Sequence, residues 1–209
     1  MGNDLNKKIG IITFHNSYNC GSMLQAFALQ QVINRLTGRK SEIVDFSNEG
    51  QQKLYSVRQP NDSLKNVIKN IILAPWFKRI ARNYESYERF KKNNFRLSNF
   101  PIHKSADLSD ADYDIVVAGS DQVWNITIED GDDAYFLPWV KSAKKVAYAP
   151  SFGAKNIADF ADDPIRYAKY LKDFSCLSIR ERNGLEWLQK LTGRSAELLL
   201  DPTLLLKQD

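Results

Sequence analysis

Short apolar runs alternate with helical patterns along this chain, and the alternation predicts its fold class. Six short, mostly apolar runs have the length of buried strands: Ile9–Phe14, Glu42–Phe46, Ile115–Ala118, Val146–Ala149, Cys176–Ile179 and Leu198–Leu200. Segments with apolar residues at helical spacing lie between most of them. We therefore predict an α/β domain whose mostly parallel sheet is covered on both faces.

The first 46 residues have the pattern of a strand–helix–strand unit. Ser22 followed by Gln25 matches a capping box and predicts the start of a helix. Apolar residues then recur at helical spacing, and Gly38 predicts the end of the helix. A right-handed crossover to the second strand is expected.

A helical insertion is predicted at about residues 63–96. Ser63–Leu73 and Trp76–Arg96 have helical patterns, and nine Lys and Arg residues lie between positions 65 and 96, interleaved with aromatics. This stretch suits contact with an anionic polymer or a membrane surface. We favour a solvated face with its aromatics packed inward, because Glu85 and Glu88 dilute the positive charge.

Composition narrows the class of protein. The chain has 209 residues, 43% of them hydrophobic, and a net charge of +4, which is too mild to predict a nucleic-acid partner. No apolar run reaches the roughly 18–20 residues of a membrane helix. Residues 1–8 show no signal-peptide features, so we predict a cytoplasmic protein. Cys20 and Cys176 are too few for a disulfide framework or a metal site.

The strand at 115–118 opens into the densest polar cluster of the chain. Gly119 is followed by Ser120, Asp121, Gln122, Trp124 and Asn125. In open α/β sheets, ligands bind at the carboxyl ends of strands. Asp121 has two equally supported roles, as a sugar-binding group or base, or as a brace that accepts backbone N–H groups. Trp124 is either a platform for a sugar ring or, as we favour, a core residue.

Other strand ends carry further candidates. Asn19, Gly21 and Ser22 precede a helix, where free N–H groups hold an anion or are simply capped. Arg180 follows Ser178, and its planar guanidinium suits a phosphate or carboxylate; the alternative is a salt bridge with Glu181 or another acid.

Several common motifs are missing from the sequence. It contains no G-x-G-x-x-G, P-loop, G-x-S-x-G or H-E-x-x-H pattern, and its histidines are His15 and His103. An acidic group at 129–133 does not match an EF-hand calcium loop and is predicted to be a solvated loop. We predict no metal site. From the residues alone, a binding domain is as well supported as an enzyme.

Five segments together resemble the polysaccharide pyruvyl transferase family. They occur in the family's order along the chain: Asn19-Cys20-Gly21-Ser22 with Leu24-Gln25-Ala26, Gly119-Ser120-Asp121-Gln122-Val123-Trp124-Asn125, Tyr148-Ala149-Pro150-Ser151-Phe152-Gly153, Ser178-Ile179-Arg180-Glu181 and Leu200-Asp201-Pro202-Thr203. The resemblance implies a Rossmann-like three-layer domain, similar to one half of a two-domain GT-B-like glycosyltransferase fold.

The resemblance also implies a reaction. Members of the family move the enolpyruvyl carbons of phosphoenolpyruvate onto two hydroxyls of one sugar, forming a cyclic pyruvate ketal in surface polysaccharide synthesis. No resident cofactor is implied, since phosphoenolpyruvate is the co-substrate donor. Arg180 matches the arginine of the family's S-x-R-[DE] motif, and we expect it to contact an anion. Asp121 is expected to bind the acceptor or act as the base. Substrate contacts are expected from Asn19, Gly21, Ser22, Ser120, Gln122, Trp124, Asn125, Ser151 and Ser178.

The resemblance covers the first half of the family pattern. Family members usually continue well past the Asp-Pro-Thr segment, so we interpret residues 1–209 as one N-terminal domain without the second domain. The expected partners are phosphoenolpyruvate and a sugar or lipid-linked saccharide, with peripheral membrane contact and self-association as further hypotheses. The alternative function is a glycosyltransferase-like sugar-binding or scaffolding module without catalysis.

Overall fold

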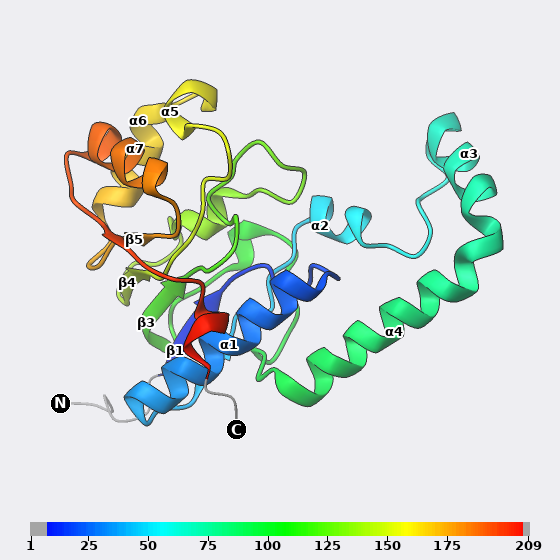
Figure 1. The fold of residues 1–209 in the computed structure, drawn as a ribbon, viewed down its shortest axis with the longest axis horizontal. Coiled ribbons are helices and arrows are strands. Elements are labelled where there is room, and N and C mark those ends of the chain that lie inside the picture. Colours follow the sequence, from blue (N-terminus) through cyan, green and yellow to red (C-terminus); the bar gives the residue numbers. More distant parts are fainter. Residues whose placement is uncertain (1–7, 207–209) are drawn as a thin grey trace.

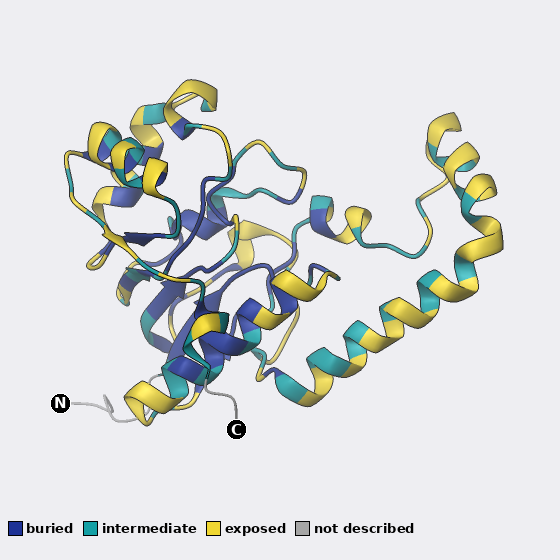
Figure 2. Ribbon diagram, in the orientation of Figure 1, coloured by how far each residue is buried: buried dark blue, intermediate teal, exposed yellow. Residues whose placement is uncertain are grey.

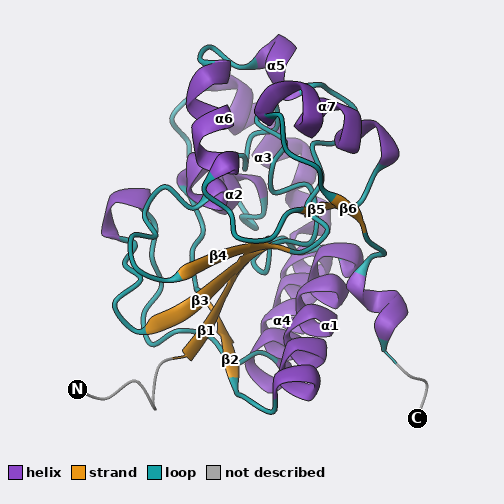
Figure 3. Cartoon of the chain, turned by 90° about the vertical axis from the view of Figure 1, so that its left-hand side faces the viewer, coloured by secondary structure: helices purple, strands orange, loops and turns teal. Residues whose placement is uncertain are grey.

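A four-stranded parallel sheet forms the centre of the protein. The computed structural model describes residues 8–206. The sheet has the order β2-β1-β3-β4, with β1 at Lys8–Ile12, β2 at Ser41–Ile43, β3 at Tyr113–Ala118 and β4 at Lys144–Ala147. Helices flank this sheet (Figure 1; Figure 3). The predicted α/β class is therefore confirmed, and the fold is Rossmann-like.

A short parallel pair continues the sheet beyond β4. Strand β5 (Ser178–Ile179) pairs with β6 (Glu197–Leu198). The Ala147 amide donates to the Cys176 carbonyl at 3.0 Å, which joins this pair to β4. The Ser178 hydroxyl adds a second link, donating to the Ala147 carbonyl at 2.7 Å and accepting from the Ala149 amide at 2.9 Å. The last two predicted strands therefore exist, but each is shorter than expected.

Helix α1 (Cys20–Thr37) covers one face of the sheet. Alternate strand residues such as Ile9 and Ile11 pack against its Met23 and Leu29, because successive side chains point to opposite faces of a strand. The predicted capping box is wrong: the side chain of Asn19 caps the helix by accepting from the Ser22 amide. Gly38 ends the helix in the left-handed conformation, as predicted.

The opposite face is covered largely by a segment without regular helices. Ala134–Leu137 are fully buried there, mostly within the short 3-10 helix η4 (Asp133–Phe136). Helices α5 (Ile157–Phe160), α6 (Pro164–Lys172) and α7 (Arg182–Thr192) complete this side. The prediction of a solvated loop around the acidic residues is wrong, since this segment supplies core aromatics directly after its acidic positions.

The helical insertion forms an arm. It contains α3 (Leu64–Leu73), η2 (Ala74–Trp76) and α4 (Phe77–Asn94), and the short helix α2 (Glu49–Leu54) precedes it. Helix α3 lies away from the sheet, and α4 runs from α3 back toward the sheet (Figure 1). Inward packing is confirmed for aromatics of α4, where Phe90 contacts Phe27 of α1. Helix α3 has no aromatic residue to pack inward, and none of its residues is buried (Figure 2). No helix within residues 8–206 is long and apolar enough to cross a membrane.

The strand order locates the place where a ligand is expected. Strand β1 is followed by β2 on one side and β3 by β4 on the other, so the chain leaves the neighbouring carboxyl ends of β1 and β3 in opposite directions. Such a switch point opens a crevice outside the carboxyl ends of the strands. Here the residues after β1 and β3 meet in that crevice. They include Asn19, Ser22 and Asp121, all three of which were predicted from the sequence.

Candidate functional site

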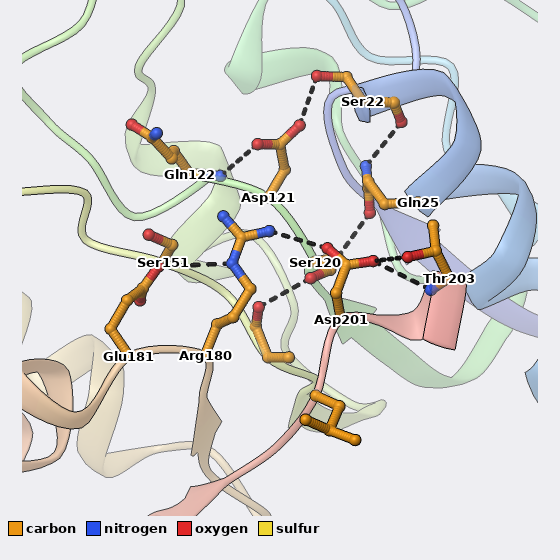
Figure 4. A network of polar contacts seen from close by, with 12 residues as sticks. Ser22, Gln25, Ser120, Asp121, Gln122, Ser151, Arg180, Glu181, Asp201 and Thr203 are labelled. Atoms are coloured by element: carbon orange, nitrogen blue, oxygen red, sulfur yellow. Dashed lines mark hydrogen bonds and ion pairs between the residues drawn. The ribbon is translucent and has the colours of Figure 1, made fainter. Parts of the chain in front are cut away.

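Asp121 connects the two segments that meet at the switch point. Its Oδ2 accepts a hydrogen bond from the Ser22 hydroxyl at 2.5 Å, and its Oδ1 accepts from the Gln122 amide at 2.8 Å. The backbone carbonyl of Asp121 accepts from the Ser151 amide at 2.8 Å. The two contacts of the Asp121 carboxylate are drawn in Figure 4. The predicted brace role is therefore confirmed, while the base role stays a prediction.

The backbone around Asp121 is left-handed at several positions. Gly119 has φ 127°, Asp121 has φ 64° and Ala149, across the crevice wall, has φ 46°. Aspartate tolerates this region better than most residues, whereas alanine does so only at a cost. The local conformation turns the Asp121 side chain away from the core and toward the amino end of α1.

A cavity of about 480 Å³ lies beside Asp121. Four predicted site residues line it, namely Asn19, Ser22, Asp121 and Gln122. Asp130 lines the same cavity although its side chain is largely buried. Burial, together with the negative charges of Asp121 and Glu129, raises the pKa of Asp130 above its usual value. This cavity thus offers acidic groups and hydroxyls, which suit sugar hydroxyls better than an anionic donor.

Sequence reasoning missed Asp130 because its position gives no local signal. It lies in a stretch of acidic residues that resembles an ordinary surface loop. Only the packing of residues 134–137 against the sheet carries it to the crevice. Two acids in one cavity with different environments are a common arrangement for acid–base chemistry.

The amino end of α1 already faces a carboxylate. A negative charge is stabilised at a helix amino end by the helix dipole. Ser22 belongs to the first turn, and its hydroxyl binds Asp121, so the Asp121 carboxylate itself occupies this position. The Ser22 amide is also engaged by the Asn19 side chain. Gly21 is exposed at the same turn. Asn19 therefore caps the helix in place of the predicted Ser22, and anion binding at this turn stays a prediction.

Arg180 lies on the neighbouring part of the same edge. Its Nη1 donates to Asp201 at 3.0 Å and its Nε to Glu181 at 3.4 Å, so the predicted salt bridge with an acid is present. Asp201 also caps η5 (Pro202–Leu205) by accepting from the Thr203 amide. Among residues 8–206, no hydrogen bond engages Nη2 of Arg180. In Figure 4 the guanidinium points toward the loop that carries Asp121.

Five predicted contact residues are buried instead of exposed to a ligand. Trp124 is 0% exposed and donates its Nε1–H to the Tyr135 carbonyl at 3.1 Å, so its ring offers no face to a sugar. The core alternative for Trp124 is thus confirmed. The other four also lie within the walls: Ser120 and Ser178 bond to the backbone of a neighbouring segment, and Asn125 and Ser151 bond within their own loops. For these residues the structure supports a positioning role in place of direct contact.

Comparison with known proteins gives one match. A family model described as polysaccharide pyruvyl transferase matches residues 19–209. Searches of curated proteins and of solved structures found no match. The matched range begins at Asn19, the residue that caps α1, and includes every residue of the site described above.

Proposed function

We propose a function from one premise: the chain belongs to the polysaccharide pyruvyl transferase family, whose model covers most of it. The proposed reaction transfers the pyruvyl group of phosphoenolpyruvate to two hydroxyls of one sugar, giving a cyclic ketal and inorganic phosphate. The observation that supports it is the crevice at the switch point, where the Asp121 carbonyl accepts from the Ser151 amide and the Arg180 amide donates to the Pro150 carbonyl, so that both residues adjoin the loop after β4. One side offers acceptors for sugar hydroxyls, and the other offers a cation for the donor.

The reaction requires a proton donor, a proton acceptor and a cation. A proton adds to the methylene carbon of the donor and leaves an oxocarbenium-like centre. Two sugar hydroxyls then bond to that carbon while its bond to the phosphate oxygen breaks. One hydroxyl proton passes to a base and the other leaves with phosphate. We assign the role of general base to Asp121. We assign to Arg180 the binding of the anionic groups of phosphoenolpyruvate. Asp130, whose pKa is raised, is the described residue best suited to carry the first proton.

The function is tested by incubating the natural full-length protein with phosphoenolpyruvate and a panel of saccharides. We expect phosphate release that depends on the saccharide, together with a product heavier by the mass of a pyruvate ketal. Phosphate release is followed by a coupled assay and the ketal by mass spectrometry. The absence of both products across a broad panel would contradict the proposed reaction.

Arg180→Lys is expected to weaken phosphoenolpyruvate binding about tenfold, because an ammonium cannot reproduce the two-pronged contact of a guanidinium. Isothermal titration calorimetry with phosphoenolpyruvate measures the change. Arg182→Lys is the matched control, since Arg182 is exposed on α7. Equal affinity of the Arg180→Lys variant and the unmodified protein would remove Arg180 from the site.

Asp121→Asn is expected to lower the rate of ketal formation roughly 100-fold to 1000-fold, the range typical of a lost general base. The Oδ1 of an asparagine still accepts from the Gln122 amide, and its Nδ2 can donate to the Ser22 hydroxyl oxygen, so the loop is expected to keep its conformation. The pH profile of the rate separates the two roles of Asp121. A variant with full activity and an unchanged profile would leave only the brace.

A non-catalytic saccharide-binding module is the second candidate function. Asp121 and Arg180 are both hydrogen-bonded to other residues of the chain, and these contacts favour structural roles for the two side chains. In that case saccharides bind and phosphoenolpyruvate is not consumed. The phosphate assay above distinguishes the two functions directly.

Further parts of the proposal concern the surroundings of the protein. The exposed side chains of α3 include Leu64, Ile68 and Ile71, with Lys65 and Lys69 between them. This combination supports peripheral contact with an anionic membrane that carries a lipid-linked acceptor. Self-association through the same face is the alternative, and sedimentation with and without vesicles separates them.

A cytoplasmic location and a second domain facing the crevice also stay predictions. Residues 1–7, on which the predicted location partly relied, lie outside the described range.

A further inference from the structure

A second cavity, of about 570 Å³, lies between the sheet edge and the arm. Its walls come from the segment after β1, from the segment through α2 and from α4, with His103 at one side. None of the site residues predicted from the sequence lines it. Tyr55 lines both this cavity and the one beside Asp121, so the two are neighbours. We call it the arm cavity.

The arm cavity is lined by two carboxylates, Asp45 and Glu88, and by one ammonium, Lys91. Asp45 accepts hydrogen bonds from the buried His15 at 2.9 Å and from Asn16 at 3.2 Å. Burial acts to raise the pKa of Asp45, but His15, Lys91 and Asn16 outweigh it and hold that pKa below its usual value. Lys91 donates to Asn16 at 2.8 Å and pairs with Glu88 at 2.7 Å. The cavity therefore offers fixed donors and acceptors without an excess of positive charge for an anion.

Aromatic rings form the rest of the wall. Tyr18 packs edge-on against Tyr84 at 4.7 Å and against Tyr55 at 5.9 Å, measured between ring centroids. The hydroxyl of Tyr18 donates to Glu88. Rigid rings with polar tips beside carboxylates and amides suit a ligand that has both C–H faces and hydroxyls.

One buried polar atom in the wall lacks a partner. Gln51 is 1% exposed and lines the arm cavity, and its Nε2 donates to Ser17 at 3.0 Å. Its Oε1 has no hydrogen-bond partner among the described residues. A buried carbonyl oxygen without a donor is costly, and a turn of the Gln51 side chain toward the cavity would let a ligand hydroxyl supply one.

We propose that the arm cavity is a subsite for a neutral sugar residue of the acceptor, adjoining the residue that is modified beside Asp121. This inference rests on the proposed function for the identity of the acceptor. It makes the acceptor an oligosaccharide that extends past Tyr55 from one cavity into the next. It also gives the insertion a role, because α4 supplies Tyr84, Glu88 and Lys91 to the subsite.

The test measures saccharide binding without phosphoenolpyruvate, so its result is independent of the reaction. The full-length protein is titrated with neutral mono-, di- and trisaccharides, and binding is followed by saturation-transfer NMR. We expect di- or trisaccharides to bind more tightly than their component monosaccharides. Tyr84→Ala is expected to weaken that binding roughly fivefold to tenfold, and Tyr84→Phe to retain most of it. Helix α4 has no buried residue, so the alanine variant is expected to fold.

Asp45→Asn provides a second probe of the same subsite, with the exposed Asp107→Asn as its control. We expect the Asp45 variant to lose affinity for the longer saccharides and the Asp107 variant to keep it. Binding that is equal for mono- and trisaccharides, or unaffected by both Tyr84→Ala and Asp45→Asn, would overturn the subsite. Absence of binding by every saccharide would overturn it too. Loss of ketal formation with intact saccharide binding would count against the reaction alone.

Discussion

Trp124→Ala is expected to lower the free energy of unfolding by about 4 kcal/mol, within the range of other buried aromatic residues replaced by alanine. Trp124 is fully buried, and its ring stacks on Phe136 and packs against Phe152 and Phe174. Its Nε1–H is the donor that satisfies the buried Tyr135 carbonyl. The substitution therefore leaves a cavity and an unpaired acceptor together. Urea unfolding followed by circular dichroism measures the change.

Two other substitutions separate the causes of this loss. Trp124→Phe keeps most of the apolar contact and removes the hydrogen bond, so we expect a loss of about 1–2 kcal/mol. Trp76→Ala is the matched control, because Trp76 is 52% exposed at the start of α4, and its loss is expected to stay within about 0.5 kcal/mol. A Trp124→Ala protein as stable as the Trp76→Ala protein would contradict the core assignment.

Gly119→Ala is expected to lower the free energy of unfolding by about 3 kcal/mol, from backbone strain and steric overlap together. Gly119 has φ +127°, and a Cβ atom there would lie 2.1 Å from the Tyr148 carbonyl oxygen. The clash is with backbone, so a side-chain rotation cannot relieve it. Thermal and urea unfolding of the variant give the measurement.

Gly38→Ala serves as the control for strain without overlap. Gly38 has φ +65°, and no heavy atom lies within 4 Å of the place a Cβ would take. We expect a loss of about 1 kcal/mol for this variant, from conformation alone. A similar loss for both variants would show that the loop after β3 moves to accept the methyl group. In that case, saccharide binding beside Asp121 should also change.

The parts of the site that were predicted correctly are those that follow directly from strand ends. Asp121, Ser22 and Asn19 lie in the segments that follow predicted strands, and parallel strands bring such segments to one edge. The roles within this group were harder to predict. The sequence predicted Ser22 as the cap of α1, whereas the capping residue is Asn19, and the Ser22 hydroxyl holds Asp121 instead.

The parts that were missed depend on long-range packing. Asp130 enters the Asp121 cavity because the buried residues after it cover the sheet. The arm cavity combines Asp45, Gln51 and Tyr84, which come from a predicted strand, from the segment after it and from a predicted helix. No local pattern places them together. Trp124 shows the converse case, since a conspicuous aromatic beside a polar cluster lies in the core and braces the cluster from behind.

Local sequence patterns were enough to predict the alternation of strands and helices, the parallel sheet and the edge at which polar residues gather. These depend on hydrophobic periodicity and chain direction, which are properties of neighbouring residues. The tertiary structure alone decided which polar residues face solvent and which brace the walls. It also decided that the arm encloses a second cavity. Both outcomes arise from contacts between distant segments, because burial and hydrogen-bond partners depend on what packs against a residue.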